Sequence, residues 1–437
     1  MRSKGKIRSK IESKITLHGN AIVNNGHTTL YYLANMYNYS MYTPDSISMQ
    51  LTSLYNMITN IESQFKGVKF SIFRYDDVVS PEGYVSSLVD TIRLWNESFV
   101  PSDDFLNNVK YTSSQFCFIA INIDDKNAVD LNSMNLMDAA KEVMNDFLNA
   151  VSSSKQQDIN VEKVEAINKQ ILDLSQGILK PCPERTLMTY YIKRVFPSYN
   201  VVVRDSMYDT TKVVLAYLQQ EYVPYFNYFE MKNSGIEYFG ATPRVTYGSI
   251  IDIIEMPDDI DSEMWSMCVD GLVCNLKTLS KDKARLKFMR TRSDIEYEEA
   301  TSNQVGGDKY AMELADYSDL AEAGIAAVSL GRKIVEGDVH ILVLADSVEE
   351  LNTRRANLIS ALKNQDVIAT FNPRQAETYV KSFIKLRPEE YDFLMDLRYP
   401  LAWKLDSGTQ IGDFDSGMQS PIIGQTATKS EATNISQ

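Results

Sequence analysis

The stretch from Val339 to Phe371 constrains the fold more than any other part of the chain. Its first residues, Val339 to Ala345, are apolar apart from one histidine and predict a buried strand. Ser347-Val348-Glu349-Glu350 follows as a capping box, in which a serine and a glutamate close the first turn of a helix. A helix over residues 348–363 and a strand from Asp366 to Phe371 complete the pattern. The stretch therefore predicts a strand–helix–strand unit.

The flanking sequence extends this unit over residues 245–385, with the order β-α-α-β-α-β-α. Gly306-Gly307 separates two of the helices, as in a helical hairpin, and the acidic cluster Glu296-Glu298-Glu299 is expected in a solvated loop between them. The order resembles a ferredoxin-like split βαβ unit with an inserted helix pair. The further predicted elements are a strand pair or one long strand (244–256) and helices at 262–290, 308–333 and 373–385.

Residues 15–123 predict a second unit with the order β-β-α-β-α-β. Asn24-Asn25-Gly26 offers an Asn-Gly turn of the kind that closes β-hairpins. Apolar residues recur at spacings of three and four in helix 44–65, and Pro44 suits its first turn. The unit is expected to be a small open sheet that helices cover on one side. Its predicted elements are strands 15–23, 28–42, 68–75 and 115–123 and helices 44–65 and 81–96.

The predicted fold class is α+β, and the chain divides into five predicted segments. The middle of the chain contains candidate helices at 134–152, 160–176 and 184–196. The tail is rich in Gly, Ser, Thr and Gln, a composition typical of disorder. The segments are a basic N-terminal arm (1–14), an N-terminal α+β module (15–125), a helical region (126–199), a ferredoxin-like α/β domain with an inserted helical hairpin (200–406) and a disordered tail (407–437).

The charge of the chain limits its partners. The 437 residues carry a formal net charge of −14, and such an acidic surface repels phosphate backbones. The first fourteen residues are basic instead, so they either make weak contacts with anionic lipid or nucleic acid or fray as a solvated terminus. No stretch approaches the ~20 apolar residues that cross a bilayer, and the N-terminus lacks the apolar core of a signal peptide. We expect a cytoplasmic protein, at most peripheral at the inner face of the cell membrane.

The sequence contains no intact catalytic motif, only a degenerate one. The tail comes nearest to a phosphate-binding loop, because Lys429 and Ser430 match the last two positions of that motif. Thr428 stands where the loop needs a glycine, Gly424 is one residue out of place, and only seven residues follow Ser430. The four cysteines and three histidines show no zinc spacing. We therefore expect no catalytic residue, no cofactor and no metal.

Three stretches follow the order of a known family. Leu187 to Pro197 predicts a helix that ends in an arginine-aromatic step, and Arg244 to Pro257 predicts a strand that leads to a proline. Val339 to Leu386 contains a strand, an S-x-E-E-L helix, a strand and a helix with Gln375 and Phe383. In this order the chain resembles, over residues 15–400, the amino-terminal, non-motor half of the type IV secretion (conjugation) ATPases of the TraC and TrsE type.

In that family a RecA-like motor follows, whereas this sequence ends before one. The resemblance implies a structural or docking component of a conjugation apparatus of the kind that plasmids and other mobile genetic elements carry. It also implies channel proteins and a separate motor ATPase as partners. A homo-oligomer is a further expectation for the chain. Two alternatives stay open: a truncated or split conjugation ATPase that needs a separate motor chain, and a mobile-element or phage protein of unrelated function that uses a ferredoxin-like module.

Overall fold

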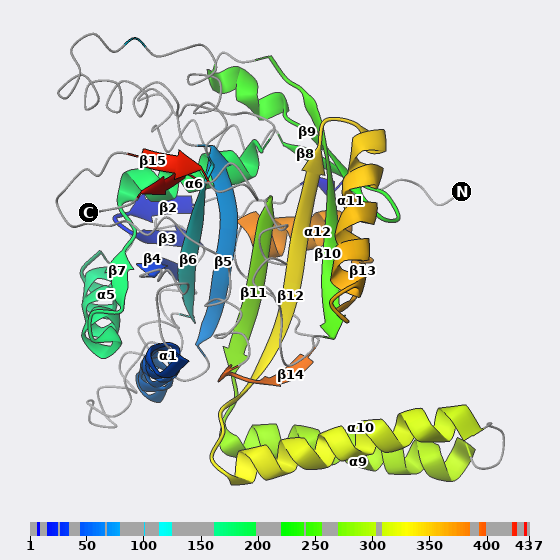
Figure 1. Ribbon diagram of the computed structural model, residues 1–437. Helices are drawn as coiled ribbons and strands as arrows, with labels where there is room; N and C mark the ends of the chain where they lie inside the picture. Colours follow the sequence, from blue (N-terminus) through cyan, green and yellow to red (C-terminus); the bar gives the residue numbers. More distant parts are fainter. Residues whose placement is uncertain are drawn as a thin grey trace, which may run out of the picture.

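One large antiparallel sheet with helices on both faces dominates the computed structural model of this chain (Figure 1). The structure describes residues 7–8, 15–24, 27–34, 44–65, 68–78, 100, 113–124, 161–197, 220–239, 242–255, 270–302, 308–384, 393–398, 422–425 and 432–434.

The sheet has fourteen strands, in the order β1-β8-β9-β10-β12-β11-β5-β6-β4-β3-β2, with β13 and β14 paired to β10 and β12 and β7 paired to β4. Its described pairings are all antiparallel. The strands are β1 (Ile7–Arg8), β2 (Ile15–His18), β3 (Ala21–Asn24), β4 (His27–Ala34), β5 (Lys69–Val78), β6 (Ser113–Asp124), β7 (Leu179–Pro181), β8 (Glu221–Pro224), β9 (Phe229–Lys232), β10 (Val245–Glu255), β11 (Gly271–Thr278), β12 (Ile334–Ala345), β13 (Ile368–Phe371) and β14 (Phe393–Asp396).

Two halves of the sheet repeat the same strand order. In the first half the order is β7-β4-β6-β5, and in the second it is β13-β10-β12-β11. Counted along the chain, each half therefore places its fourth strand beside its first, its first beside its third, and its third beside its second.

The halves join edge to edge through β5 and β11. Six residue pairs form this antiparallel junction, from Lys69 opposite Lys277 to Arg74 opposite Leu272. Ser71 donates a hydrogen bond to Asn275 across it at 2.8 Å. The junction makes one continuous sheet out of two repeats.

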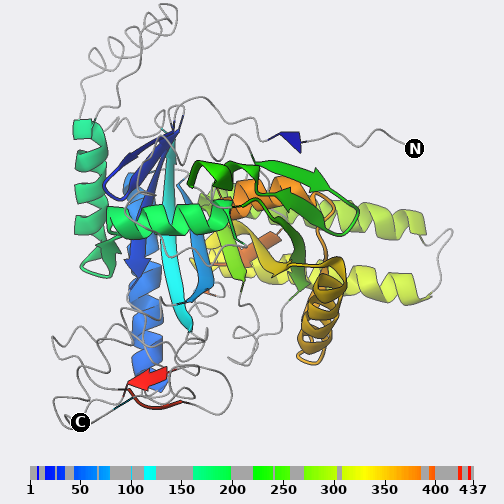
Figure 2. The same ribbon diagram turned by 90° about the horizontal axis from the view of Figure 1, so that it is seen from above.

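Helices cover both faces of the sheet, so the core has two apolar layers. Seen from above, α1 (Pro44–Gln64) and α11 (Val348–Lys363) lie on one side, and α6 (Glu184–Val195) and α12 (Gln375–Thr378) lie on the other (Figure 2). On the first side α5 (Val161–Ser175) joins the same layer, and on the second the π-helix η4 (Tyr379–Ile384) continues α12. The prediction that helices cover the first unit on one side is therefore wrong, because α6 buries Tyr190 and Ile192 against Phe118 and Phe73 on the face opposite α1.

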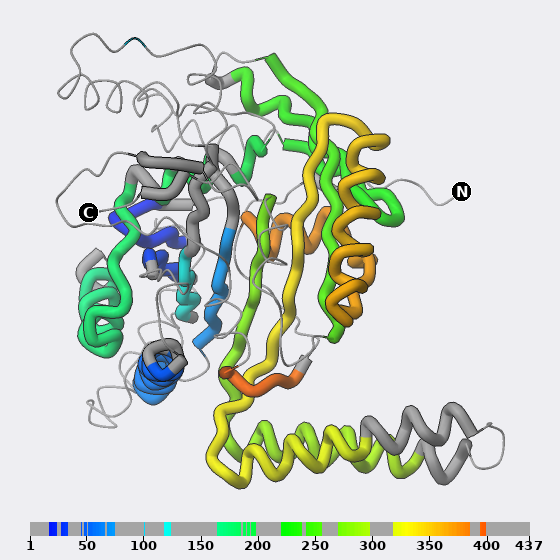
Figure 3. Tube along the Cα trace, in the orientation of Figure 1, coloured from blue at the N-terminus to red at the C-terminus, as the bar shows by residue number. Residues whose placement is uncertain are grey.

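A helical hairpin projects beyond one end of the sheet (Figures 1 and 3). It consists of α9 (Lys281–Ser302) and α10 (Asp308–Ser329), and it connects the central strands β11 and β12. The predicted hairpin is present, but its first helix spans Lys281–Ser302 rather than residues 262–290. The acidic cluster at Glu296, predicted in a loop, lies instead within α9, where Glu296 pairs with Arg292 one turn away at 2.8 Å.

The predicted helix over residues 262–290 is wrong in its middle, where β11 runs through the centre of the sheet. Leu272, Val273, Cys274 and Leu276 are buried on both faces of this strand, so their apolar run lacks the alternation that marks a half-exposed strand. Lys281, which lies near the end of the predicted helix, instead begins α9.

Several predicted elements are confirmed with small shifts in their ends. They are α1, α5, α6 and α11, together with strands β5, β6, β10 and β12. Ser347 caps α11 as expected, since its hydroxyl accepts a hydrogen bond from the Glu350 N–H at 3.2 Å. Where one helix was predicted over residues 373–385, residues 375–384 form a short α-helix followed by the π-helix η4.

The first predicted hairpin is divided differently. The strand expected over residues 15–23 breaks at Gly19, whose φ of 58° falls in the left-handed region, and Asn20 completes this turn. Three strands, β2, β3 and β4, therefore occupy a segment predicted to hold two. β7 also adds a strand to the predicted helical region by pairing with β4.

Both ends of the chain contain short pairings. Ile7 and Arg8 of the predicted basic arm pair with Tyr222 and Glu221 of β8. In the tail, β15 (Ile422–Gln425) pairs with β16 (Ala432–Asn434), so the prediction of a disordered tail does not hold for these residues. The β-branched pair Ile422-Ile423 favours this strand. The remaining short helix η3 (Ser234–Phe239) follows β9.

Some predictions lie outside the described residues, namely helices 81–96 and 134–152 and most of the basic arm. Among the helices that the structure describes, none combines the length and the apolar character that crossing a bilayer requires.

Candidate functional site: a buried polar network

On the face of the sheet that carries α6 and α12, the strands change from apolar to polar along their length. In β12, Leu342 packs in the apolar layer, but the next residues on the same face are His340, Asp338 and Glu336, all buried. The pairing register puts Asn275 of β11 opposite Asp338, and Asp252 of β10 opposite His340. Neighbouring strands therefore bring these polar side chains into one row.

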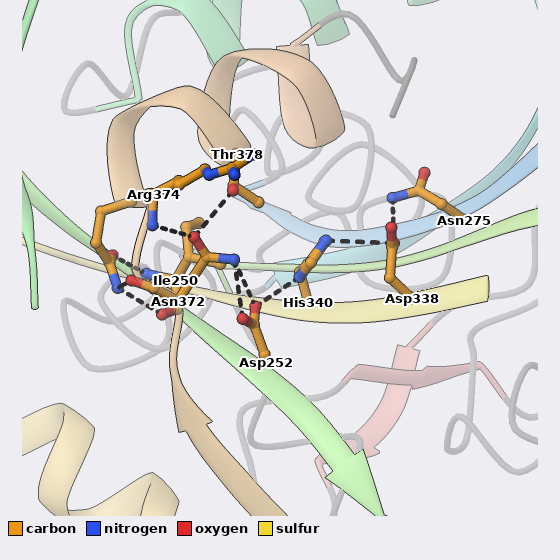
Figure 4. A network of polar contacts seen from close by, with 9 residues as sticks. Ile250, Asp252, Asn275, Asp338, His340, Asn372, Arg374 and Thr378 are labelled. Atoms are coloured by element: carbon orange, nitrogen blue, oxygen red, sulfur yellow. Dashed lines mark hydrogen bonds and ion pairs between the residues drawn. The ribbon is translucent and has the colours of Figure 1, made fainter. Parts of the chain in front are cut away.

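His340 lies at the centre of the row, between two carboxylates (Figure 4). Its Nδ1 is 2.7 Å from Oδ1 of Asp252, and its Nε2 is 3.2 Å from Oδ1 of Asp338. Buried charges are stable in proteins where they are paired and hydrogen-bonded, and here both ring nitrogens have an anionic partner.

Two asparagines extend the row in opposite directions. Asn275 donates from Nδ2 to Asp338 at 2.7 Å and accepts from the Ser71 hydroxyl on β5. Asn372, directly after β13, donates from Nδ2 to both Asp252 oxygens at 3.0 and 2.8 Å. The network thus links β5, β11, β12, β10 and the segment that leads into α12.

The Asn372 carbonyl oxygens anchor the start of α12. Oδ1 of Asn372 accepts from the Arg374 N–H at 2.7 Å and from the Thr378 hydroxyl at 3.0 Å. Gln375 continues the contact with β10, because its side chain exchanges two hydrogen bonds with the backbone of Ile250, at 2.5 and 2.8 Å. Ile250 lies between the stretches of β10 that pair with β9 and with β13, so Gln375 fills a gap in the strand ladder.

The two aspartates determine the charge of His340. Burial by itself lowers the pKa of a histidine, but the charges and hydrogen bonds of Asp338 and Asp252 outweigh it and raise the pKa of His340 to about 10. The ring is therefore an imidazolium at neutral pH, and the three side chains together carry a net charge of −1.

This arrangement suits a structural role. A general base needs a neutral ring nitrogen, and a metal ligand needs a free lone pair, whereas both nitrogens of His340 donate to carboxylates. Among the described residues, no group of three or more His, Cys, Asp or Glu side chains is arranged to hold a metal ion.

The residues singled out from the sequence do not meet in this network. Gly424 lies in β15, with its Cα opposite Thr433, and Lys429 and Ser430 lie outside the described residues. Cys182 and Cys274 are buried free thiols, and burial raises the pKa of Cys182 to about 12 and that of Cys274 well above its ordinary value. Neither thiol is poised as a nucleophile at neutral pH.

Sequence reasoning missed Asp252, Asp338, Asn275 and Asn372. A signal was present, because Asp252 interrupts an isoleucine run and Asp338 and His340 alternate within an apolar strand. A buried strand tolerates such residues only where a neighbour pairs with them, but the sequence does not show which strands are neighbours.

The hairpin offers the second feature of functional interest, an exposed surface. We define the outer edge of α9 by Lys283, Leu286, Met289, Arg290 and Tyr297, which are all exposed. Its apolar members are strongly exposed, Leu286 at 53%, Met289 at 49% and Tyr297 at 74%. Exposed apolar side chains in a row with cations are typical of contact surfaces.

Comparisons with known proteins add no relative: no family model matches the chain, and no curated protein is significantly similar to it.

Proposed function

We propose that the chain is a structural or docking component of a conjugation apparatus, a type IV secretion-like system for DNA transfer. In this proposal it resembles the amino-terminal half of the energising ATPase and contributes docking surfaces rather than nucleotide hydrolysis. Its partners are channel proteins and a separate motor ATPase, which hold it in the cytoplasm at the inner face of the cell membrane. The resemblance in the order of elements supports this assignment.

The observation that carries the docking role is the α9–α10 hairpin. It leaves the sheet between two central strands and projects beyond it (Figure 3). The buried residues among its described side chains are Ala284, Ile295, Ala321 and Val328, two of them alanines. A long insertion with exposed apolar residues favours contact with another protein over internal packing.

We further propose that each half of the sheet is a ferredoxin-like unit. The repeated strand order, with the fourth strand beside the first and the third beside the second, supports this reading. In the second half the hairpin is then an insertion between the second and third strands of the unit. Two such units joined edge to edge form a broad scaffold, and that architecture is compatible with many activities.

The buried network supports the non-catalytic part of the proposal. His340, Asp252 and Asp338 satisfy one another, so the network stabilises strand register rather than acting on a substrate. The alternative of a split ATPase is tested by isothermal titration of the purified chain with ATP and magnesium. No heat at millimolar nucleotide is expected, and saturable heat would favour the split ATPase.

Co-purification from donor cells tests the docking role. A tagged chain is expected to recover channel or motor subunits, and replacing the hairpin by a short turn is expected to abolish that recovery. Lys169→Glu on the exposed side of α5 is the matched control and should recover the same subunits. A crosslinked chain that brings down no subunit of a transfer apparatus would refute the proposal and favour an unrelated phage or mobile-element function.

A further inference from the structure

The outer edge of α9 is unusually basic for this chain. Residues 281–292 contain six cations and one carboxylate, a local charge of +5 in a chain of net charge −14. Lys287 pairs with Glu336 of β12, and Arg292 pairs with Glu322 of α10 at 3.1 Å. Lys283 and Arg290 are exposed and make no ion pair with a described residue. The edge therefore combines free positive charge with exposed apolar side chains.

The described stretch of α10 from Asp319 to Ala326 contains two carboxylates and no cation. We define the outer edge of α10 by Asp319, Leu320, Ala323 and Ala326, all of them exposed. Leu320 is 65% exposed, and Asp319 makes no ion pair with a described residue. Small residues beside one exposed leucine leave room for larger side chains from another helix.

We propose that the outer edge of α9 packs against the outer edge of α10 in a second copy of this chain. Leu286 and Met289 would lie over Leu320 and the two alanines, with Arg290 near Asp319. One contact of this kind covers both exposed edges and pairs opposite charges, which favours the correct partner during encounter.

The two helices match in length. Each has 22 residues, which corresponds to ~33 Å at 1.5 Å per residue, so either helix is long enough to span the edge of the other. An anionic membrane fits this edge less well, because Asp294 and Glu296 precede Tyr297 on the same helix and the whole chain is acidic.

The contact joins different surfaces of two copies, so it does not close on a dimer. A head-to-tail contact continues into a ring or an open array. The inference rests on the proposed function in so far as it names a partner for the docking hairpin. Its test uses only the purified chain, so a negative result leaves recovery of channel subunits from cells unaffected.

Sedimentation velocity of the full chain over a concentration series tests this contact. We expect the wild type to form species larger than a dimer as its concentration rises towards ~100 µM. Arg290→Glu alone and Asp319→Lys alone should each raise the dissociation constant about tenfold or more, because each places like charges opposite one another. The double variant R290E/D319K restores opposite charges in every contact and should regain assembly.

Circular dichroism and thermal unfolding control for folding, and both exposed substitutions should leave them unchanged. A wild type that stays monomeric throughout the series would overturn the proposal. So would a double variant no better than the single ones. Binding of anionic vesicles that Arg290→Glu abolishes, without any change in oligomeric state, would assign the edge to a lipid surface instead.

Discussion

At His340, two carboxylates keep an imidazolium charged in a place where burial alone would remove its proton. The raised pKa means that the folded chain binds this proton more tightly than the unfolded chain does. The resulting stabilisation is complete below the ordinary histidine pKa of 6.5 and is lost as the pH rises towards about 10. The network is therefore a stabilising element with a defined pH dependence.

His340→Gln should reduce the free energy of unfolding by about 3–5 kcal/mol at pH 6.5, because it leaves Asp252 and Asp338 as buried anions without a cation. Urea denaturation of wild type and variant at pH 6.5 and 8.5 measures this difference. The difference should shrink by about 1.4 kcal/mol for each unit by which the pH rises, because the proton on wild-type His340 then contributes less to the stability of the folded chain. Buried thiols such as Cys182 begin to affect the pH dependence of stability only near their ordinary pKa of 9.0.

A double variant provides the control. His340→Gln with Asp338→Asn keeps the net charge of −1 in the trio, so it should cost less than His340→Gln alone. Equal stability of the two variants, or a wild type whose advantage does not depend on pH, would contradict an ionised His340.

At the scale of elements, the hairpin behaves as an insertion between β11 and β12. These strands pair directly, from Gly271 opposite Leu342 to Thr278 opposite Val335, so the ladder does not depend on the helices. Replacing residues 281–329 by a short Gly-containing turn should leave the far-UV signal of the sheet and a cooperative thermal transition. Loss of cooperative unfolding would show that the hairpin belongs to the core.

Elements with a clear period or cap could be predicted from the sequence, as α1, α5 and α11 show. β11 could not, because a strand buried on both faces has no alternation to distinguish it from a buried helix. The buried polar network could not be predicted either, because its residues are far apart in the sequence. Asp252 and His340 are 88 residues apart, and only the strand order brings them together.

At the scale of the whole molecule, the β5–β11 junction should make the two halves unfold together. Opening either half would break six residue pairs and leave Asn275 and Asp338 without the Ser71 end of their network. In hydrogen exchange under increasing denaturant, peptides from β6 and β12 should lose protection at the same concentration. Loss of protection in one half well before the other would indicate independent domains.

The docking role is tested most directly by the frequency of DNA transfer from donor cells that lack this chain. Transfer should fall when the chain is removed and return with the wild type and with Lys169→Glu, but not with the form whose hairpin is replaced by a turn. Transfer that is unchanged without the chain, or fully restored by the form without the hairpin, would contradict the account.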